Sequence, residues 1–255
     1  AKRSNCSLED YLQMLKEAGL GSIPGTAAEI LDQEIRDTIS PERISVEDWI
    51  KVIKYAHSIG INSTSTIMYG HIESYLDIVK HLAILKNIQK ETNGFTEFVP
   101  LSFVHSEAPM YNRNLIKNIR SGPTGEEVLK MHAIARIFLN NHIENIQVSW
   151  VKEGPRMAQI LLEAGVNDFG GTLINESIST SAGASFGQLL KPKEIRNLIH
   201  GIGKIPAQRS SKYNIIKKFS EEDYMNEELL DQSNPQDFGS YNELIKLDSF
   251  RFKRI

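Results

Sequence analysis

Residues able to take part in chemistry lie at or near the ends of predicted strands, in several separate segments of the chain. Their side chains provide carboxylates, imidazoles, hydroxyls, an amide, a phenol and a thioether. They are Glu29, Thr66, Met68, Tyr69, His71, Glu97, His105, Gln147, Ser149, Asp168 and Thr172. The carboxyl ends of parallel strands share one rim of a sheet, and this rim is the usual active site of α/β proteins. The pattern therefore predicts an active site at that rim.

Two of these residues also have a plain structural interpretation. His71 follows Tyr69 and Gly70 and fits a turn or a cap as well as a binding site. Glu97 lies inside an apolar run, where unpaired burial of a carboxylate is costly. An inward position of Glu97 would therefore favour a ligand contact. The alternation of residues 95–99 does not decide which face Glu97 takes.

The segment 19–32, GLGSIPGTAAEILD, is the most informative stretch of the chain. A short apolar run ends at Pro24 and Gly25. Thr26 and Glu29 then have the spacing of a capping box, which predicts a helix over residues 27–39. A strand that passes into a helix in this way brings backbone N–H groups and a carboxylate to the rim of a sheet. Glu29 is therefore expected either to cap its own helix or to bind a ligand.

Apolar periodicity and cap patterns predict the other elements. Strands are expected near residues 20–24, 62–69, 95–101, 146–151 and 168–174, and helices near 8–18, 27–39, 46–59, 75–92, 125–141, 155–164 and 192–201. Alternating strands and helices indicate a parallel α/β sheet. The order favours the C-terminal part of a (β/α)8-type barrel, about strands 4–8, with a flavodoxin-like sheet as the alternative. Residues 1–203 would form this partial barrel, and residues 204–255 a weakly structured C-terminal extension.

The composition excludes several classes of protein. Lys and Arg total 29 and Asp and Glu total 32, a formal charge of −3, so no basic excess points to nucleic acid or to a membrane surface. No apolar stretch has the roughly 18–20 residues of a transmembrane helix. Cys6 is the only cysteine, which rules out an internal disulfide and favours a cytoplasmic location. It also rules out a cysteine-bound metal cluster made from this chain.

Five segments together resemble one enzyme family. They are GLGSIPGTAAEILD (19–32), TSTIMYGHIE (64–73), GFTEFVPLSFVHSEAP (94–109), NIQVSWVKEGP (145–155) and AGVNDFGGTLINESISTSAGASFGQ (164–188). The chain resembles, over roughly residues 7–213, the radical S-adenosylmethionine (SAM) transferases that join L-tyrosine to 5-amino-6-(D-ribitylamino)uracil in deazaflavin (FO) synthesis.

The resemblance implies a cofactor set and a division of roles. It implies a radical generated from SAM at a [4Fe-4S] cluster, fragmentation of tyrosine, and transfer of its 4-hydroxybenzyl group. It places SAM at Glu29, Thr66, Met68 and Tyr69. The two substrates are expected at the polar side chains that the predicted strands bring to or near the rim: His71, Glu97, His105, Gln147, Ser149, Asp168 and Thr172. The other deazaflavin synthase subunit is the expected protein partner.

The chain departs from the family pattern in one respect. The family carries its cluster on a CxxxCxxC motif after the first barrel strand, and Cys6 is not part of such a motif. This predicts a fragment of a transferase whose cluster ligands lie in a preceding segment, and which is inactive alone. The alternatives are a sister radical SAM enzyme of futalosine-route menaquinone synthesis and a non-catalytic partner subunit.

Overall fold

The computed structural model describes residues 5–174, 176–187 and 189–234. The chain forms two compact units. The first comprises Ala1–Phe103, Ile116–Gln147 and Gly165–Asn167, and the second comprises Val104–Leu115, Val148–Ala164 and Asp168–Ile255. Residues 204–234 are part of the second unit, and the domain division expected at residue 203 stays a prediction.

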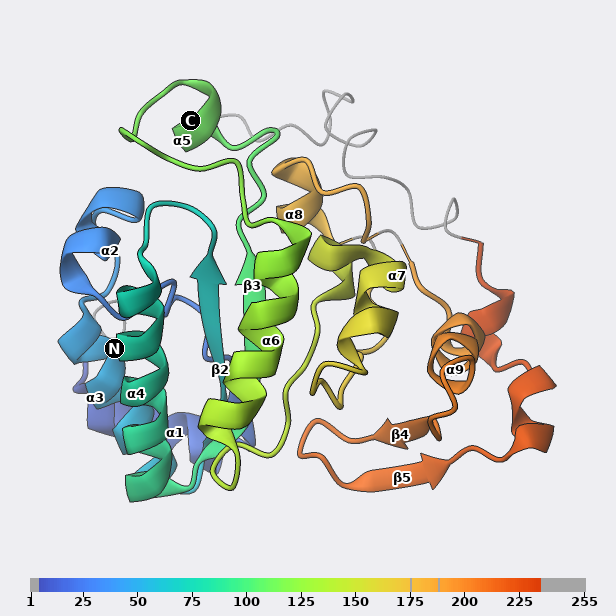
Figure 1. The fold of residues 1–255 in the computed structure, drawn as a ribbon. Helices are drawn as coiled ribbons and strands as arrows, with labels where there is room; N and C mark the ends of the chain where they lie inside the picture. The colour runs from blue at the N-terminus through green and yellow to red at the C-terminus, as the bar shows by residue number, and fades with distance from the viewer. Residues whose placement is uncertain (1–4, 175, 188, 235–255) are drawn as a thin grey trace, which may run out of the picture. The chain divides into compact units, whose positions relative to one another are not determined.

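The first unit is built on a parallel sheet with the strand order β1-β2-β3, of which Figure 1 labels β2 and β3. The strands are β1 (Ser22–Ile23), β2 (Asn62–Tyr69) and β3 (Phe95–Ser102). The next segment of the chain continues the sheet, because the Phe98 N–H donates to the Asn145 carbonyl at 2.9 Å and the Gln147 N–H donates to the Phe98 carbonyl at 3.0 Å. The predicted parallel arrangement is therefore confirmed for the first three strands and reaches residues 145–147 as a short bridge.

Helices cover this sheet and cap themselves with local residues. They are α1 (Leu8–Glu17), α2 (Gln33–Ile39), α3 (Val46–Ser58), α4 (Tyr75–Thr92) and α6 (Gly125–Leu139). Helices α3 and α4 pack on β2 and α6 packs on β3, with α4 beside α6 (Figure 1). Ile67, Leu82 and Phe98 are fully buried in the core of this unit. Ser45 accepts the Asp48 N–H at 3.0 Å and so caps α3, as its place three residues before Asp48 in the sequence predicts.

The second unit contains short helices and an antiparallel hairpin. Its elements are α5 (Pro109–Asn112), α7 (Trp150–Leu161), α8 (Ser177–Ser181), α9 (Pro192–His200), β4 (Ala207–Arg209), β5 (Ile215–Lys218) and the 3-10 helices η2 (Glu221–Met225) and η3 (Leu229–Gln232). Residues 204–234 are thus more regular than the weakly structured extension that was expected, and 235–255 lie outside the described residues. Within the described part of the chain, every helix is too short or too polar to span a bilayer.

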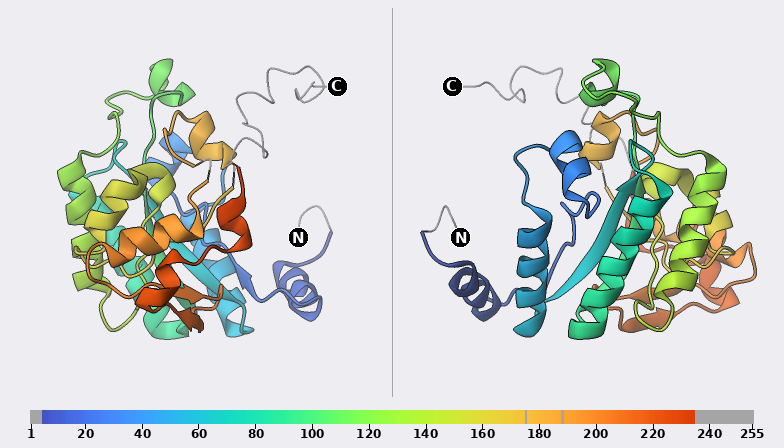
Figure 2. Two further views of the ribbon diagram at one scale, coloured as in Figure 1. Left: turned by 90° about the vertical axis from the view of Figure 1, so that its right-hand side faces the viewer. Right: turned by 60° about the vertical axis from the view of Figure 1, so that its left-hand side comes forward.

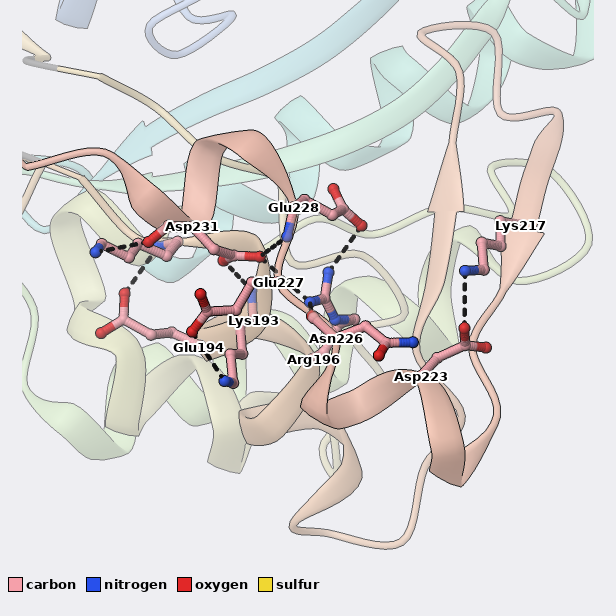
Figure 3. Close-up of polar contacts among 10 residues, drawn as sticks. Lys193, Glu194, Arg196, Lys217, Asp223, Asn226, Glu227, Glu228 and Asp231 are labelled. Atoms are coloured by element: carbon pink, nitrogen blue, oxygen red, sulfur yellow. Dashed lines mark hydrogen bonds and ion pairs between the residues drawn. The ribbon is translucent and has the colours of Figure 1, made fainter.

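The two 3-10 helices are fastened to α9 by a group of charged and polar residues that we call the tail clasp: Lys193, Arg196, Asn226, Glu228 and Asp231. Figure 2 shows η2 and η3 against α9, and Figure 3 shows the side chains. Arg196 Nη1 pairs with Glu228 Oε1 at 2.9 Å, and Arg196 Nη2 donates to the Asn226 carbonyl at 2.7 Å. Asp231 accepts the Lys193 N–H at 2.7 Å. Because that N–H belongs to the first turn of α9, it has no partner inside the helix.

Three of the predicted elements are wrong in part. The helix expected over 27–39 begins only at Gln33, where Asp32 accepts the Ile35 N–H at 3.2 Å. The strand expected over 146–151 ends early because Trp150 begins α7. The segment 168–174 forms no regular strand, since Gly170 and Gly171 have φ values of 92° and 120° that break an extended chain. The barrel itself stays a prediction.

Candidate functional site

The loop that precedes α2 is tied to strand β2 at Gly25. The Gly25 N–H donates to Thr64 Oγ1 at 2.7 Å, and Thr66 Oγ1 donates to the Gly25 carbonyl at 3.0 Å. A Cβ atom at position 25 would lie only 1.8 Å from the Thr64 carbonyl oxygen. Glycine is therefore required here by the close approach of two backbones.

The loop then passes through two left-handed residues that are not glycine. Ala27 has a φ of 63° and Glu29 a φ of 46°. Such conformations cost about 1–3 kcal/mol each and persist only where the surroundings impose them. The Met68 N–H donates to the Glu29 carbonyl at 2.7 Å, which brings Glu29 to the carboxyl-terminal half of β2. This geometry excludes the predicted capping box, because Glu29 is not part of a helix.

The carboxylate of Glu29 is uncommitted. It is half-buried, and among residues 5–174, 176–187 and 189–234 it has no hydrogen-bond or ion-pair partner. Burial lowers the pKa of the nearby Arg36, and the Glu29 carboxylate partly offsets that effect. A free carboxylate beside the end of a parallel strand can accept hydrogen bonds from the hydroxyls or ammonium group of a ligand.

Of the other residues expected at the cofactor, Thr66 and Tyr69 are buried and Met68 is half-buried. The Thr66 hydroxyl is used by Gly25, as described above. The Tyr69 hydroxyl accepts a hydrogen bond from Ser102 Oγ at 3.2 Å. These residues form the strand against which the Glu29 loop rests, with Met68 the most accessible of the three.

His71 is completely buried in a turn that follows β2. Its Nδ1 accepts the Ile72 N–H at 2.8 Å, so Nε2 carries the hydrogen and donates to the Met68 carbonyl at 3.1 Å. Burial lowers the pKa of His71, against the opposing charge of Glu73, whose Oε2 accepts the His71 N–H at 2.9 Å. These contacts match the turn interpretation of His71, and its substrate contact stays a prediction.

Glu97 and Gln147 lie on neighbouring segments of the same sheet. Glu97 is 8% exposed, so its side chain does not face solvent. It is the third residue of β3, five residues before Ser102, and so about 16 Å from the carboxyl end of that strand. Tyr69 pairs with Ser102, at that far end. Glu97 therefore lies further from that end of the sheet than His71 does, and its substrate contact stays a prediction.

The remaining predicted residues belong to the second unit. Asp168 is 8% exposed and binds Arg209 through two contacts, of which the one between Arg209 Nη2 and Asp168 Oδ1 is 3.1 Å long. Asp168 also accepts the Gly170 N–H at 2.7 Å. The Arg209 guanidinium lies 3.9 Å from the centre of the Tyr213 ring. Sequence reasoning missed Arg209 and Tyr213, although the apolar runs around residues 205 and 215 are typical of a hairpin that would carry them.

Ser149, Thr172 and His105 are each half-buried. The Ser149 carbonyl accepts the Glu153 N–H at 3.0 Å and so starts α7. The ring of His105 contacts Tyr111 edge to face, with centroids 4.8 Å apart. The seven predicted substrate residues are thus divided, with His71, Glu97 and Gln147 in the first unit and the other four in the second.

No group of three His, Cys, Asp or Glu side chains in the described part of the chain is arranged to hold a metal. With Cys6 as the only cysteine of the sequence, the residues present do not fit an iron–sulfur cluster. They do fit a polar organic ligand at Glu29. Fold and site therefore define an α/β protein with a parallel sheet and an uncommitted carboxylate on the loop after its first strand.

Comparison with known proteins identifies the family to which the chain belongs. Residues 92–222, about half of the chain, match the family described as CofH/MqnC C-terminal region, and the chain belongs to this family. The chain is 52% identical over 217 residues to a 5-amino-6-(D-ribitylamino)uracil–L-tyrosine 4-hydroxyphenyl transferase of Methanococcus aeolicus. It is 51% identical over 217 residues to the protein of that name from Methanocaldococcus jannaschii, and 51% over 216 residues to that from Methanospirillum hungatei.

These alignments cover different shares of the two proteins. Each covers 85% of this chain but only 59%, 60% and 58% of the three relatives, in the same order. The chain therefore spans about three fifths of the length of the curated relatives it matches. The family resemblance found in the sequence is confirmed by these matches.

Proposed function

We propose that this chain provides the substrate- and SAM-binding part of a 5-amino-6-(D-ribitylamino)uracil–L-tyrosine 4-hydroxyphenyl transferase. The observation that carries the proposal is identity of about 50% over 85% of the chain with proteins of that name. The proposed reaction transfers the 4-hydroxybenzyl group of L-tyrosine to the ribityl uracil. That the three relatives share one activity in their names favours this reaction over the futalosine-route alternative.

In this proposal Glu29 binds SAM. Its carboxylate is free of partners in the described part of the chain, and two ribose hydroxyls are suitable donors to one carboxylate. Thr66, Met68 and Tyr69 form the neighbouring strand wall, and the tight packing at Gly25 keeps the loop in place. When bound, SAM would supply the radical that activates tyrosine. The protein contributes position and exclusion of water.

The chain's own residues do not hold the [4Fe-4S] cluster that the family chemistry requires, since only one cysteine is present. The proposal therefore assigns the cluster ligands to protein outside these 255 residues. The substrates would meet the polar residues His71, Glu97, His105, Gln147, Ser149, Asp168 and Thr172 in the assembled enzyme. The other deazaflavin synthase subunit is proposed as the partner that works with this enzyme.

A chimera tests the function directly. The 217 aligned residues of the Methanococcus aeolicus relative are replaced by those of this chain, and the chimera is reconstituted with iron and sulfide. It is then supplied with a reductant, SAM, L-tyrosine and the ribityl uracil, and the condensation product is measured by mass spectrometry. The proposal expects product at a rate within about tenfold of the parent enzyme. A folded, cluster-loaded chimera that cleaves SAM but never forms the product would overturn it.

The Glu29→Gln variant of the same chimera tests the site. Loss of one charge-assisted hydrogen bond costs about 1.5–3 kcal/mol, so SAM affinity should fall about tenfold or more. The melting temperature should stay nearly unchanged, because the Glu29 carboxylate has no hydrogen bond within the described protein to lose. Glu34→Gln, an exposed change on α2, is the matched control and should leave SAM affinity unaltered. Equal affinity in the two variants would remove Glu29 from the site.

A further inference from the structure

Arg36 is the most deeply buried lysine or arginine among the described residues of the first unit, and it is hydrogen-bonded to the loop that carries Glu29. Its side chain is 1% exposed, although it belongs to the short helix α2. It forms no ion pair with any carboxylate in the described part of the chain. A buried guanidinium without an ion-pair partner is costly, so its hydrogen bonds to the protein backbone must account for its presence.

Those hydrogen bonds converge on the left-handed part of the loop. Arg36 Nη1 donates to the Ala27 carbonyl at 2.7 Å and also to the Ala28 carbonyl. Nη2 donates to the Ile44 carbonyl. The planar guanidinium thus binds the successive carbonyls of residues 27 and 28 in the left-handed part of the loop. It also connects them to Ile44, in the segment before α3. A lysine ammonium is a point charge on a flexible chain and cannot reproduce this planar arrangement.

The neighbours of Glu29 explain what this arrangement does. Ala28 and Ile30 are 0% exposed and Leu31 is 4% exposed, so Glu29 is the only residue of 28–31 that is not buried. The Leu31 N–H donates to Nδ1 of the buried His81 at 3.0 Å, which fixes the other end of the segment. Burial lowers the pKa of His81 to about 3, so this histidine stays neutral and keeps Nδ1 as an acceptor.

We infer that Arg36 is a positioning residue: it holds residues 27–29 in their left-handed conformation, and this conformation turns the Glu29 carboxylate outward while its neighbours stay buried. The part of the inference that concerns SAM rests on the proposed function. The part that concerns the loop conformation does not, and can be measured without any ligand.

The Met68 amide reports on the position of Glu29, because it donates to the Glu29 carbonyl. Hydrogen exchange is measured on the 255-residue chain and on its Arg36→Lys variant. We expect the Met68 amide to exchange at least tenfold faster in the variant. The Ser63 amide on the same strand donates to the Gly94 carbonyl at 3.1 Å and should be unchanged. Arg43→Lys, an exposed change in the same region, is the control and should alter neither amide.

A rescue experiment separates positioning from a general loss of folding. Glycine adopts positive φ without strain, so Ala27→Gly should restore much of the Met68 protection in the Arg36→Lys background. This holds even if the single variant is too unstable to study, because the double variant can then be compared with the wild type. Unchanged Met68 exchange in a folded Arg36→Lys variant overturns the inference. Failure of glycine to restore protection also overturns it.

SAM binding by the reconstituted chimera, carrying the same substitutions, tests the link to Glu29. If Arg36 acts through Glu29, Arg36→Lys and Glu29→Gln each lower the affinity for SAM. The affinity of the double variant should then lie within about threefold of that of the weaker-binding single variant. Fully additive losses overturn the link. If the Met68 amide exchanges faster in Arg36→Lys but Glu29→Gln does not change SAM affinity, the proposed SAM site fails while the assignment of Arg36 to the loop stands.

Discussion

We expect the Asp231→Asn substitution in the tail clasp to weaken the hydrogen bonding of the first turn of α9. Asp231 has a 2% exposed side chain and accepts three hydrogen bonds in the structure. Oδ1 accepts the Lys193 N–H at 2.7 Å, and Oδ2 accepts the Glu228 N–H at 2.8 Å and Arg196 Nη2 at 3.3 Å. An asparagine has the same shape but offers only one acceptor oxygen. Its NH2 group must then face at least one of these donors.

The size of the effect follows from these contacts. A hydrogen bond to a charged group contributes about 1.5–3 kcal/mol, and the Asp231→Asn variant would lose at least one of them. Arg196 keeps its contacts with Glu228 and with the Asn226 carbonyl, which limits the loss. We therefore expect about 2–4 kcal/mol, equivalent to an acceleration of about 30- to 1000-fold in exchange of the Lys193 amide.

The assay is hydrogen exchange at Lys193, because that amide has no partner inside its helix and depends on Asp231. Asp223→Asn is the matched control. Asp223 has the same place in its own 3-10 helix and pairs with Lys217 at 2.9 Å, but its side chain is 22% exposed. It should change Lys193 exchange by no more than about twofold. An increase below about threefold in Asp231→Asn would refute the assignment of Asp231 as the cap of α9.

The pH dependence provides an independent check. Burial by itself raises the pKa of Asp231, but the N–H groups of Glu228 and Lys193 and the charge of Arg196 outweigh burial, so the net pKa is lowered. A carboxylate with a lowered folded-state pKa stabilises the protein above its unfolded pKa of about 3.9. That stabilisation is lost as the pH falls through the folded-state pKa. The difference between wild type and variant should be constant from about pH 5 to 8 and shrink below about pH 4.

Two further predictions concern the first unit. Gly25→Ala should destabilise this unit by about 1–3 kcal/mol or more, because the new Cβ would meet the Thr64 carbonyl. Urea unfolding measures the loss, and an unchanged midpoint would contradict the packing described. Burial lowers the pKa of His57 from 6.5 to about 4, so the folded state resists its protonation and loses up to about 3 kcal/mol of stability as the pH falls from about 6.5 to 4. Stability measured against pH should be flatter over that range in His57→Gln.

Local patterns in the sequence were sufficient to predict the features that depend on residues close together in the chain. The caps at Ser45 and Thr124 involve residues three positions apart, and both are observed. Strand β2 was predicted from β-branched residues and has the expected bounds, Asn62–Tyr69. Such features are decided by backbone geometry over a few residues, which a single sequence displays directly.

The features that sequence analysis missed depend on distant partners. Arg209 reaches Asp168 across 41 positions, and neither residue has a local signal for the other. The depth of Glu97 in β3 depends on where the strand starts relative to its neighbours, and the alternation of side chains does not contain that information. Polar pairs and strand registers of this kind are set by tertiary contacts, so they became visible only in the structure.

The error at residues 27–32 is the most instructive for the site. Thr26 and Glu29 have the spacing of a capping box, and an isolated peptide with this sequence would favour that helix start. In the protein, the hydrogen bonds from Arg36 and from Met68 select a left-handed loop instead, against local preference. A glutamate inside a capping box uses its carboxylate on its own backbone. Because the helix begins at Gln33, that use is excluded, and the Glu29 carboxylate is left available for a ligand at the end of the sheet.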